Sequence, residues 1–357
     1  MSTRRMNAVA PLRAARSGGF TLIELMVAMV LGLIVIAGVT SVFLAGQQSF
    51  RTNDALANVQ DSSRVAFELM VRDIRGAGLT GCNSLNNRIV NVLNNGPGNP
   101  GTTAWWADWT NAVHGYDVNS SPSDPALAGL NQVAGTDSLE LLSAGNLNVT
   151  IAGDVPGTGF TLNQSTSDVG IGDIIIACSP DHAAIMQVTG PTTAGSATLQ
   201  ANYNTGAKVS PGNCSNNLGY PNDACSGNSP DYTFPPNSKI AKLTAVDWYI
   251  GTNPAGGKSL YRISLRNSGG TTAPAPPQEM VRNVETMTIT YLNPAISAIG
   301  NQFVSASKIT ANNGWAGVTA VNVALKIRST FQRASVTGNA AISRDYAFTT
   351  TVRNRVN

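Results

Sequence analysis

The most unusual chemical feature of the sequence is a single carboxylate inside a long apolar stretch. Between Phe20 and Gly46 the chain carries one charged residue, Glu24, and no proline. A carboxylate at the centre of a bilayer costs roughly 2.5 to 3.5 kcal/mol on insertion scales, and less near the interface, so Glu24 needs a partner. If the chain is cut between Gly19 and Phe20, the new α-amino group is a cation at neutral pH that a neighbouring subunit can offer to Glu24.

The element that must position this glutamate is a helix. Residues 20–46 make about 40 Å of helix, which is enough to cross a hydrocarbon core of about 30 Å. Residues 1–19 carry four arginines and no acid. Positive charge on that side holds the leader in the cytoplasm and sends the C-terminal side outward. The apolar run is too long for the core of a secretory signal, and no small-residue cleavage box follows it.

Residues 19–25, GFTLIEL, together with the basic leader, resemble the signal of type IV prepilins and type II secretion pseudopilins. In that superfamily a membrane peptidase cuts after the glycine and methylates the new N-terminal phenylalanine, and the glutamate helps dock the subunit into a filament. The resemblance implies that Gly19 and Phe20 flank the cut, that Phe20 is N-methylated, and that Glu24 is the assembly residue. The alternative is a plain signal anchor with a chance glutamate.

The helix is expected to continue beyond the apolar run. Apolar or small residues recur at helical spacing on one face, at Leu56, Val59, Ser63, Phe67, Met70 and Ile74. Gly76 and Gly78 are expected to end it. Four segments follow from this reading: a cleaved cytoplasmic leader (1–19), a membrane-spanning or filament-core half-helix (20–46), an amphipathic half-helix (47–77) and a β-rich extracytoplasmic domain (78–357).

After residue 78 the hydrophobic period changes from 3.6 to 2, which indicates half-buried antiparallel strands. The segments with this pattern, or with a short apolar run, lie near 139–141, 173–178, 184–188, 261–265, 287–291, 321–328 and 346–352. No second amphipathic helix is evident. Residues 94–123, 202–237 and 268–278 are rich in turn-forming residues. The predicted fold is therefore α+β and pilin-like, with one long N-terminal helix packed on an antiparallel β-sheet domain.

The charge of the chain gives no reason to expect a nucleic-acid partner. The net charge is +3, but without the four arginines of the leader 19 basic residues face 20 acidic ones, and the net charge becomes −1. The basic character therefore belongs mostly to a segment that is expected to be removed. The remaining lysines and arginines are scattered and form no basic stripe with aromatic residues, so a pilin that takes up DNA is a weak alternative.

The four cysteines all follow the membrane run, on the side where disulfides are permitted. Cys214 and Cys225 lie eleven residues apart in a polar loop, and a bridge between them is worth about 3 kcal/mol on the chain-entropy model. Cys82 and Cys178 would then pair by exclusion, although four cysteines permit three connectivities. A zinc site is the rival interpretation, but the sequence has no CxxC spacing and only two histidines.

Signatures of catalysis are thin. His114 and His182 are the only imidazoles, and His182 follows Asp181 in an expected turn. There is no GxSxG motif and no phosphate-binding loop, and 157–159 (GTG) is an ordinary turn. We therefore expect no enzyme, no cofactor and no metal site. The tryptophans at 105, 106 and 109 either form an exposed surface for a sugar or a partner, or cover a satellite core under a long loop.

Later segments narrow the resemblance to PilW-type minor pilins. The pieces that carry it are 72–82 (RDIRGAGLTGC), 172–188, 259–262, 279–291, 320–328 and 351–355. The resemblance implies a structural subunit that is processed by prepilin peptidase and initiates pilus assembly with other minor pilins, the major pilin and a tip adhesin. It implies an inner-membrane protein with a periplasmic domain before assembly and a place at the pilus tip afterwards. A J-class pseudopilin of type II secretion is the nearest alternative, and a signal-anchored extracytoplasmic enzyme is a more distant one.

Overall fold

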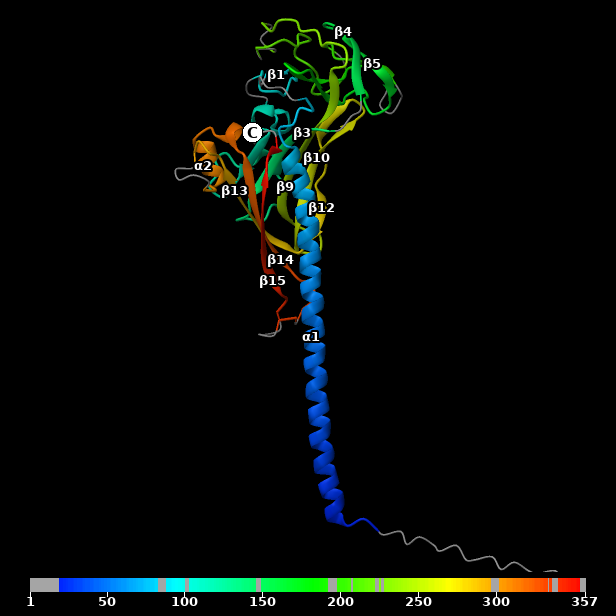
Figure 1. The fold of residues 1–357 in the computed structure, drawn as a ribbon, viewed down its shortest axis with the longest axis vertical. Helices are drawn as coiled ribbons and strands as arrows, with labels where there is room; N and C mark the ends of the chain where they lie inside the picture. The colour runs from blue at the N-terminus through cyan, green and yellow to red at the C-terminus, as the bar shows by residue number, and fades with distance from the viewer. Residues whose placement is uncertain are drawn as a thin grey trace, which may run out of the picture.

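The computed structural model shows one long helix that carries a β-rich domain at its C-terminal end (Figure 1). It describes residues 19–82, 88–99, 103–145, 149–191, 198–206, 208–221, 225, 228–296, 302–332, 334–335 and 340–353. The helix, α1 (Leu22–Gly76), spans 55 residues. The predicted α+β, pilin-like fold is confirmed.

Helix α1 has two halves with different surroundings, as its sequence predicts. From Leu22 to Gly46 nearly every side chain is exposed. In the second half one face is buried, and its members are Ala55, Val59, Ser63, Ala66, Met70 and Ile74. The helix ends at Gly76, because Ala77 is already extended and Gly78 takes a φ of +73°, which glycine adopts without strain.

Most strands belong to one large, strongly branched sheet. Its strands are β1 (Ile89–Asn91), β2 (Val113–Tyr116), β3 (Ser138–Ala144), β4 (Val149–Val155), β5 (Gly159–Thr166), β6 (Ile174–Cys178), β7 (Ala183–Gln187), β8 (Thr198–Asn202), β9 (Lys239–Thr252), β10 (Lys258–Ser268), β11 (Thr271–Pro274) and β12 (Gln278–Arg282). Strand β9 is the centre, since it pairs with β3, β4, β6 and β10 at different points of its length. Among the described strand pairs of this sheet, β1 with β7 is parallel and the others are antiparallel.

A second sheet lies beside the helix. It consists of β13 (Val284–Leu292), β14 (Ala320–Arg328) and β15 (Ser343–Thr351), all antiparallel. Phe67 of α1 packs on this sheet, with its ring centroid 4.4 Å from that of Phe348 and 6.4 Å from that of Tyr346. The main hydrophobic core is therefore shared by the buried face of α1, the three-stranded sheet and the inner face of β3 and β9.

Two predictions about local structure were wrong. Residues 268–278 were expected to be turn-like or flexible, but they contain β11 and reach the start of β12. No second amphipathic helix was expected, but a short helix of six residues, α2 (Ala306–Ala311), follows β13. Alternation gives no signal for β11, which has four residues and two prolines nearby, and α2 is too short for a helical period.

The tryptophans of the 94–123 segment belong to a core. Trp106 and Trp109 are 4% and 7% exposed, in two short 3₁₀ turns, Trp105–Ala107 and Trp109–Asn111. They pack with Leu142, Ile176 and Leu243 over one face of the sheet. The satellite-core interpretation is confirmed, and the interpretation as an exposed binding surface is wrong.

A distinct lobe lies beyond the C-terminal end of α1. Strands β4 and β5, which Figure 1 labels at the end of the molecule opposite the N-terminal half of α1, form its far part together with β8, which pairs with β5. It has a hydrophobic core of its own, which includes Ile151, Phe160, Tyr203 and Phe234. We call β4, β5 and β8 the far lobe.

Candidate processing and assembly site

The N-terminus of α1 is organised by a capping box between Thr21 and Glu24. The backbone N–H and the hydroxyl of Thr21 both donate to Glu24 Oε2, at 3.0 and 2.8 Å, and the N–H of Glu24 donates to Thr21 Oγ1 at 3.3 Å. Thr21 has an extended backbone (φ −75°, ψ 150°), as an N-cap requires. The carboxylate thus satisfies donors that the first turn of a helix leaves unpaired.

This local partner was not foreseen from the sequence. We expected Glu24 to depend on a neighbouring subunit, but Thr21 already satisfies one of its two oxygens within the chain. The signal was present, because Thr-x-x-Glu ahead of an apolar run is a capping-box pattern. Among the described residues, Oε1 of Glu24 accepts no hydrogen bond, so the carboxylate can keep its cap and still receive a donor from outside.

The predicted cleavage point lies one residue before the cap. The side chain of Phe20 is 88% exposed, and a Cβ built on Gly19 would meet no atom within 4 Å. The fold of the described chain therefore places no steric demand for glycine at this position. If glycine is needed at position 19, the need comes from an enzyme that reads the site.

The helix behind the site is suited to a bilayer. Among the described residues, one helix, α1, is long enough and apolar enough to cross a membrane. Its most apolar stretch of 18 residues is not buried inside the molecule. Apolar side chains point outward all round this half, with Leu22, Ile34 and Val42 between 63% and 77% exposed. Such a surface needs lipid or other helices around it.

Comparison with known protein families finds two matches. The prokaryotic N-terminal methylation motif matches residues 14–40, which include the cleavage point, the capping box and much of the apolar half-helix. The type IV pilus-assembly protein W family matches residues 247–354. The chain thus carries a PilW match in its C-terminal part together with the prepilin methylation motif at its N-terminus. No curated protein and no solved structure matches it.

The two family matches have direct consequences for the site. The methylation motif implies processing by a prepilin peptidase, and the hydrophobic helix with this motif is consistent with a prepilin of the inner membrane. PilW is a structural pilus-assembly family that is not known as an enzyme. Pilus partners and a place in the pilus are implied by the family, whereas the individual roles of Gly19, Phe20 and Glu24 stay predictions.

The PilW match covers strands of the domain that contact α1. Asp73 near the end of α1 accepts hydrogen bonds on Oδ2 from Arg262 Nε at 3.0 Å and from Trp248 Nε1 at 3.1 Å. The Arg262 guanidinium also lies over the Trp248 ring, 5.8 Å from its centroid. Asp73 belongs to the RDIR segment of the resemblance, so this contact gives that segment a physical role in joining α1 to β9 and β10.

Two disulfides lie in the part of the chain that precedes the PilW match. Cys82 is bonded to Cys178, 96 residues away, and Cys214 to Cys225, 11 residues away. This is the connectivity expected from the spacing. The first bond fastens β6 to the segment that follows α1.

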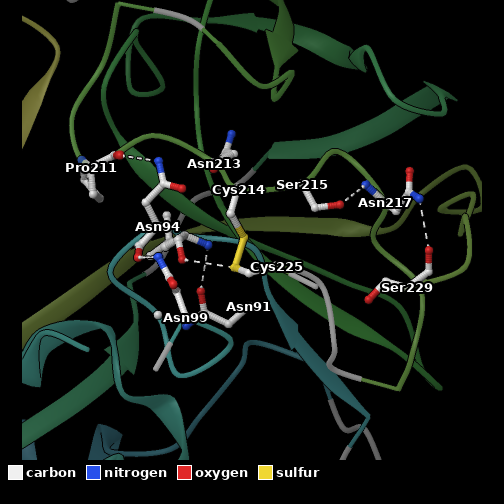
Figure 2. Close-up of a disulfide and its surroundings, with 12 residues drawn as sticks. Asn91, Asn94, Asn99, Pro211, Asn213, Cys214, Ser215, Asn217, Cys225 and Ser229 are labelled. Atoms are coloured by element: carbon white, nitrogen blue, oxygen red, sulfur yellow. Dashed lines mark hydrogen bonds between the residues drawn. A yellow bond between two sulfur atoms is a disulfide. The ribbon is translucent and has the colours of Figure 1, made fainter. Parts of the chain in front are cut away.

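The second disulfide closes a loop in which asparagine side chains replace regular secondary structure (Figure 2). Asn94 Nδ2 donates to the carbonyl oxygen of Pro211 at 2.7 Å, and Asn217 Nδ2 donates to that of Ser229 at 3.0 Å. The polar composition of 202–237 thus reflects a loop whose backbone is paired by side chains.

A row of buried titratable groups crosses the sheet, and sequence reasoning did not find it. His114 on β2 pairs in register with Glu140 on β3, which pairs with Asp247 on β9. Burial lowers the pKa of His114 to about 4. Burial, reinforced by the nearby Asp124, raises the pKa of both Glu140 and Asp247 well above the ordinary values.

The buried row lacks compensating charges. Both oxygens of Asp247 and one of Glu140 are buried and have no hydrogen-bond partner among the described residues. No group of three histidines, cysteines or carboxylates in the described part of the chain is arranged to hold a metal ion. Burial therefore favours the protonated, neutral form of these carboxyls. The other histidine, His182, is buried against Tyr232 (centroids 4.0 Å apart), and burial lowers its pKa.

Proposed function

We propose that this protein is a minor pilin of the PilW family that initiates type IV pilus assembly and occupies the tip of the filament with other minor pilins. Residues 1–19 serve as a cytoplasmic leader that prepilin peptidase removes, and 20–46 anchor the chain in the inner membrane before assembly. Residues 47–77 carry the periplasmic domain 78–357. After assembly, 20–46 pack among the helices of the other minor pilins and the major pilin.

The observation that carries the tip position is the far lobe. In a filament built from parallel helices, the space beyond the C-terminal end of one subunit's helix belongs to subunits nearer the tip. Here that space is filled by β4, β5 and β8 of the same chain (Figure 1). A subunit with this shape fits where nothing follows it, or where only a dissimilar partner such as a tip adhesin does.

The assembly role of Glu24 follows from its geometry. Its Oε2 atom is held by Thr21, and its Oε1 atom accepts no hydrogen bond from the described residues. The N-methylated amine of a neighbouring mature subunit, formed by the cut between Gly19 and Phe20, is a cation that fits the open oxygen. In a bilayer this pairing is strongly favoured, because both charges are costly when alone.

The first experiment compares cells that lack the gene with cells that carry variants of it. We expect loss of surface pili without the gene and recovery with the natural chain. Glu24→Ala should be cleaved normally but be absent from the sheared pilus fraction. Glu68→Ala is the matched control, because it removes an exposed carboxylate from the same helix and should be incorporated. Incorporation of Glu24→Ala at the natural level would refute the assembly role.

The same strains separate the proposal from a role in type II secretion. Normal pili together with a loss of secreted proteins would assign the chain to a pseudopilus, the role of the J-class pseudopilins. The PilW match over 247–354 favours the pilus. Normal pili and normal secretion together would overturn both assembly roles.

A further inference from the structure

The connection between β14 and β15 descends along α1 toward the apolar half-helix. Its described residues include Phe331, Ala334 and Ser335, which we call the foot. Figure 1 shows this connection, in the orange-to-red part of the chain, lying against α1 below the rest of the domain. Ala334 is fully buried and packs with Ala55 of the helix.

Polar side chains of the helix hold the foot in place. Thr52 Oγ1 donates to the carbonyl oxygen of Ala334 at 2.7 Å. Gln48 Nε2 donates to the carbonyl oxygens of Ala334 and Ser335, at 3.2 and 3.3 Å. These three bonds bring the domain down to residue 48, whereas the other described contacts of the domain with α1 lie farther from the membrane half.

The height of the foot matches the surface of a bilayer. Gln48 follows the last residue of the apolar run, Gly46, by about 3 Å along the helix, and Thr52 follows it by about 9 Å. The headgroup layer of one leaflet extends about 5 to 8 Å beyond the hydrocarbon core. The foot therefore lies at headgroup level when Gly46 sits at the periplasmic boundary of the hydrocarbon core.

The exposed side chains at this level suit a lipid interface. Phe331 of the foot is 39% exposed and Phe50 of the helix is 73% exposed, although both are large apolar residues. Arg51, beside Phe50, is exposed. Exposed aromatic side chains next to a cation are the combination that binds the boundary between acyl chains and lipid phosphates.

We propose that the foot is a membrane-contact surface: before assembly, Phe331 and Phe50 enter the headgroup layer of the periplasmic leaflet and Arg51 binds lipid phosphate. The contact sets the domain at a fixed height and tilt over the bilayer. The inference rests on the membrane-anchored stage of the proposed function. The partner is the bilayer that holds the helix, because Phe50 and Arg51 follow the apolar run after only three polar residues, 47–49.

The test uses the full chain reconstituted in phosphatidylglycerol-containing vesicles. The described cysteines are all in disulfides, so a thiol-reactive fluorophore labels only a cysteine that is introduced. Labels are placed at Phe331→Cys, at Val155→Cys as a control in the far lobe, and at Val35→Cys within the span. Val155 is 58% exposed, on β4. Lipids carrying a nitroxide on the headgroup or within the acyl chain serve as quenchers.

We expect headgroup nitroxide to quench the Phe331→Cys label at least about twofold more than the Val155→Cys label. Acyl-chain nitroxide should quench the Val35→Cys label. Adding Arg51→Gln should reduce the quenching of the foot label. Because the label itself alters position 331, the same comparison is repeated at Phe50→Cys.

Several results would overturn the proposal. Quenching at Phe331→Cys and Phe50→Cys no greater than at Val155→Cys, with Val35→Cys still quenched, removes the foot contact and leaves the membrane anchor intact. Loss of quenching at Val35→Cys would refute both the foot contact and the membrane anchor. Foot labels that are not quenched by lipid but shift in emission when other pilus subunits are added assign this surface to a neighbouring subunit.

Discussion

Removing one buried carboxyl should change how the stability of this protein depends on pH. Asp247 is fully buried, and neither of its oxygens has a hydrogen-bond partner in the part of the chain that the structure describes. Glu140, its neighbour on β3, is 3% exposed and faces the same nearby carboxyl, Asp124. Burial raises the pKa of both Asp247 and Glu140 well above the ordinary range, so the folded protein keeps protons that the unfolded chain releases above about pH 4.

The sign and size follow from proton linkage. A carboxyl whose folded pKa is raised leaves stability intact below its unfolded pKa and reduces it as pH rises toward the folded pKa. Each carboxyl that stays protonated only in the folded state lowers the free energy of unfolding by about 1.4 kcal/mol per pH unit. Between pH 7 and 8, His114, whose pKa is about 4, is neutral when folded, and Asp137, with a pKa of about 6, is mostly ionised. Glu140 and Asp247 each lower the free energy of unfolding as pH rises toward their raised folded pKa, by at most about 1.4 kcal/mol per pH unit.

The variant Asp247→Asn should make this decrease smaller, by at most about 1.4 kcal/mol per pH unit, because an amide does not titrate. The assay is guanidinium unfolding of the detergent-solubilised chain at several pH values between 7 and 8, followed by tryptophan fluorescence. Asp168→Asn is the control, since Asp168 is exposed on a loop and should leave the slope unchanged. Equal slopes for the natural chain and Asp247→Asn, or stability that rises from pH 7 to 8, would refute the argument.

Three further changes test the packing of the domain, each by the midpoint of chemical unfolding. Asp73→Asn should cost about 2 to 3 kcal/mol, because Arg262 loses its charged partner in a mostly buried contact; an unchanged midpoint would show that the contact is not structural. Tyr291→Phe should be neutral or stabilise by up to about 1 kcal/mol, because no described residue forms a hydrogen bond with the buried hydroxyl, and a clear loss would reveal a partner. Cys225→Ser should cost about 3 kcal/mol through the opened loop, and Cys214→Ser should match it; unequal losses would point to a role for one side chain beyond the bond.

Sequence patterns predicted the parts of the fold that have one solvent-exposed face and one buried face. Strands β14 and β15 lie in the small sheet with alternate residues exposed, and their alternation was visible in the sequence. Strand β9 was missed although it is the longest strand. Most of its residues are buried on both faces, so it shows no period of 2.

The site was predictable only where its chemistry is local in sequence. The cleavage point, Phe20 and Glu24 lie within six residues, whereas the buried row joins His114, Glu140 and Asp247 from three strands. Nothing in the sequence says which strands will be neighbours, so three separate titratable residues gave no common signal. The capping box between Thr21 and Glu24 was missed for a different reason. Its pattern is local and visible in the sequence, but it was not used to predict the partner of Glu24.

The far lobe and the helix are joined in a way that limits independent motion. Strand β9 pairs with β4 and β6 through residues 239–242 and with β10 through 246–252, so one continuous strand belongs to both parts. The PilW match begins at residue 247, in the middle of this strand. The Cys82–Cys178 bond then ties β6 back to the segment after α1. A hinge between the two parts would have to break both strand pairing and the disulfide constraint. A partner that pulls on the far lobe therefore pulls directly on α1, which is the mechanical connection that the proposed position at the filament tip requires.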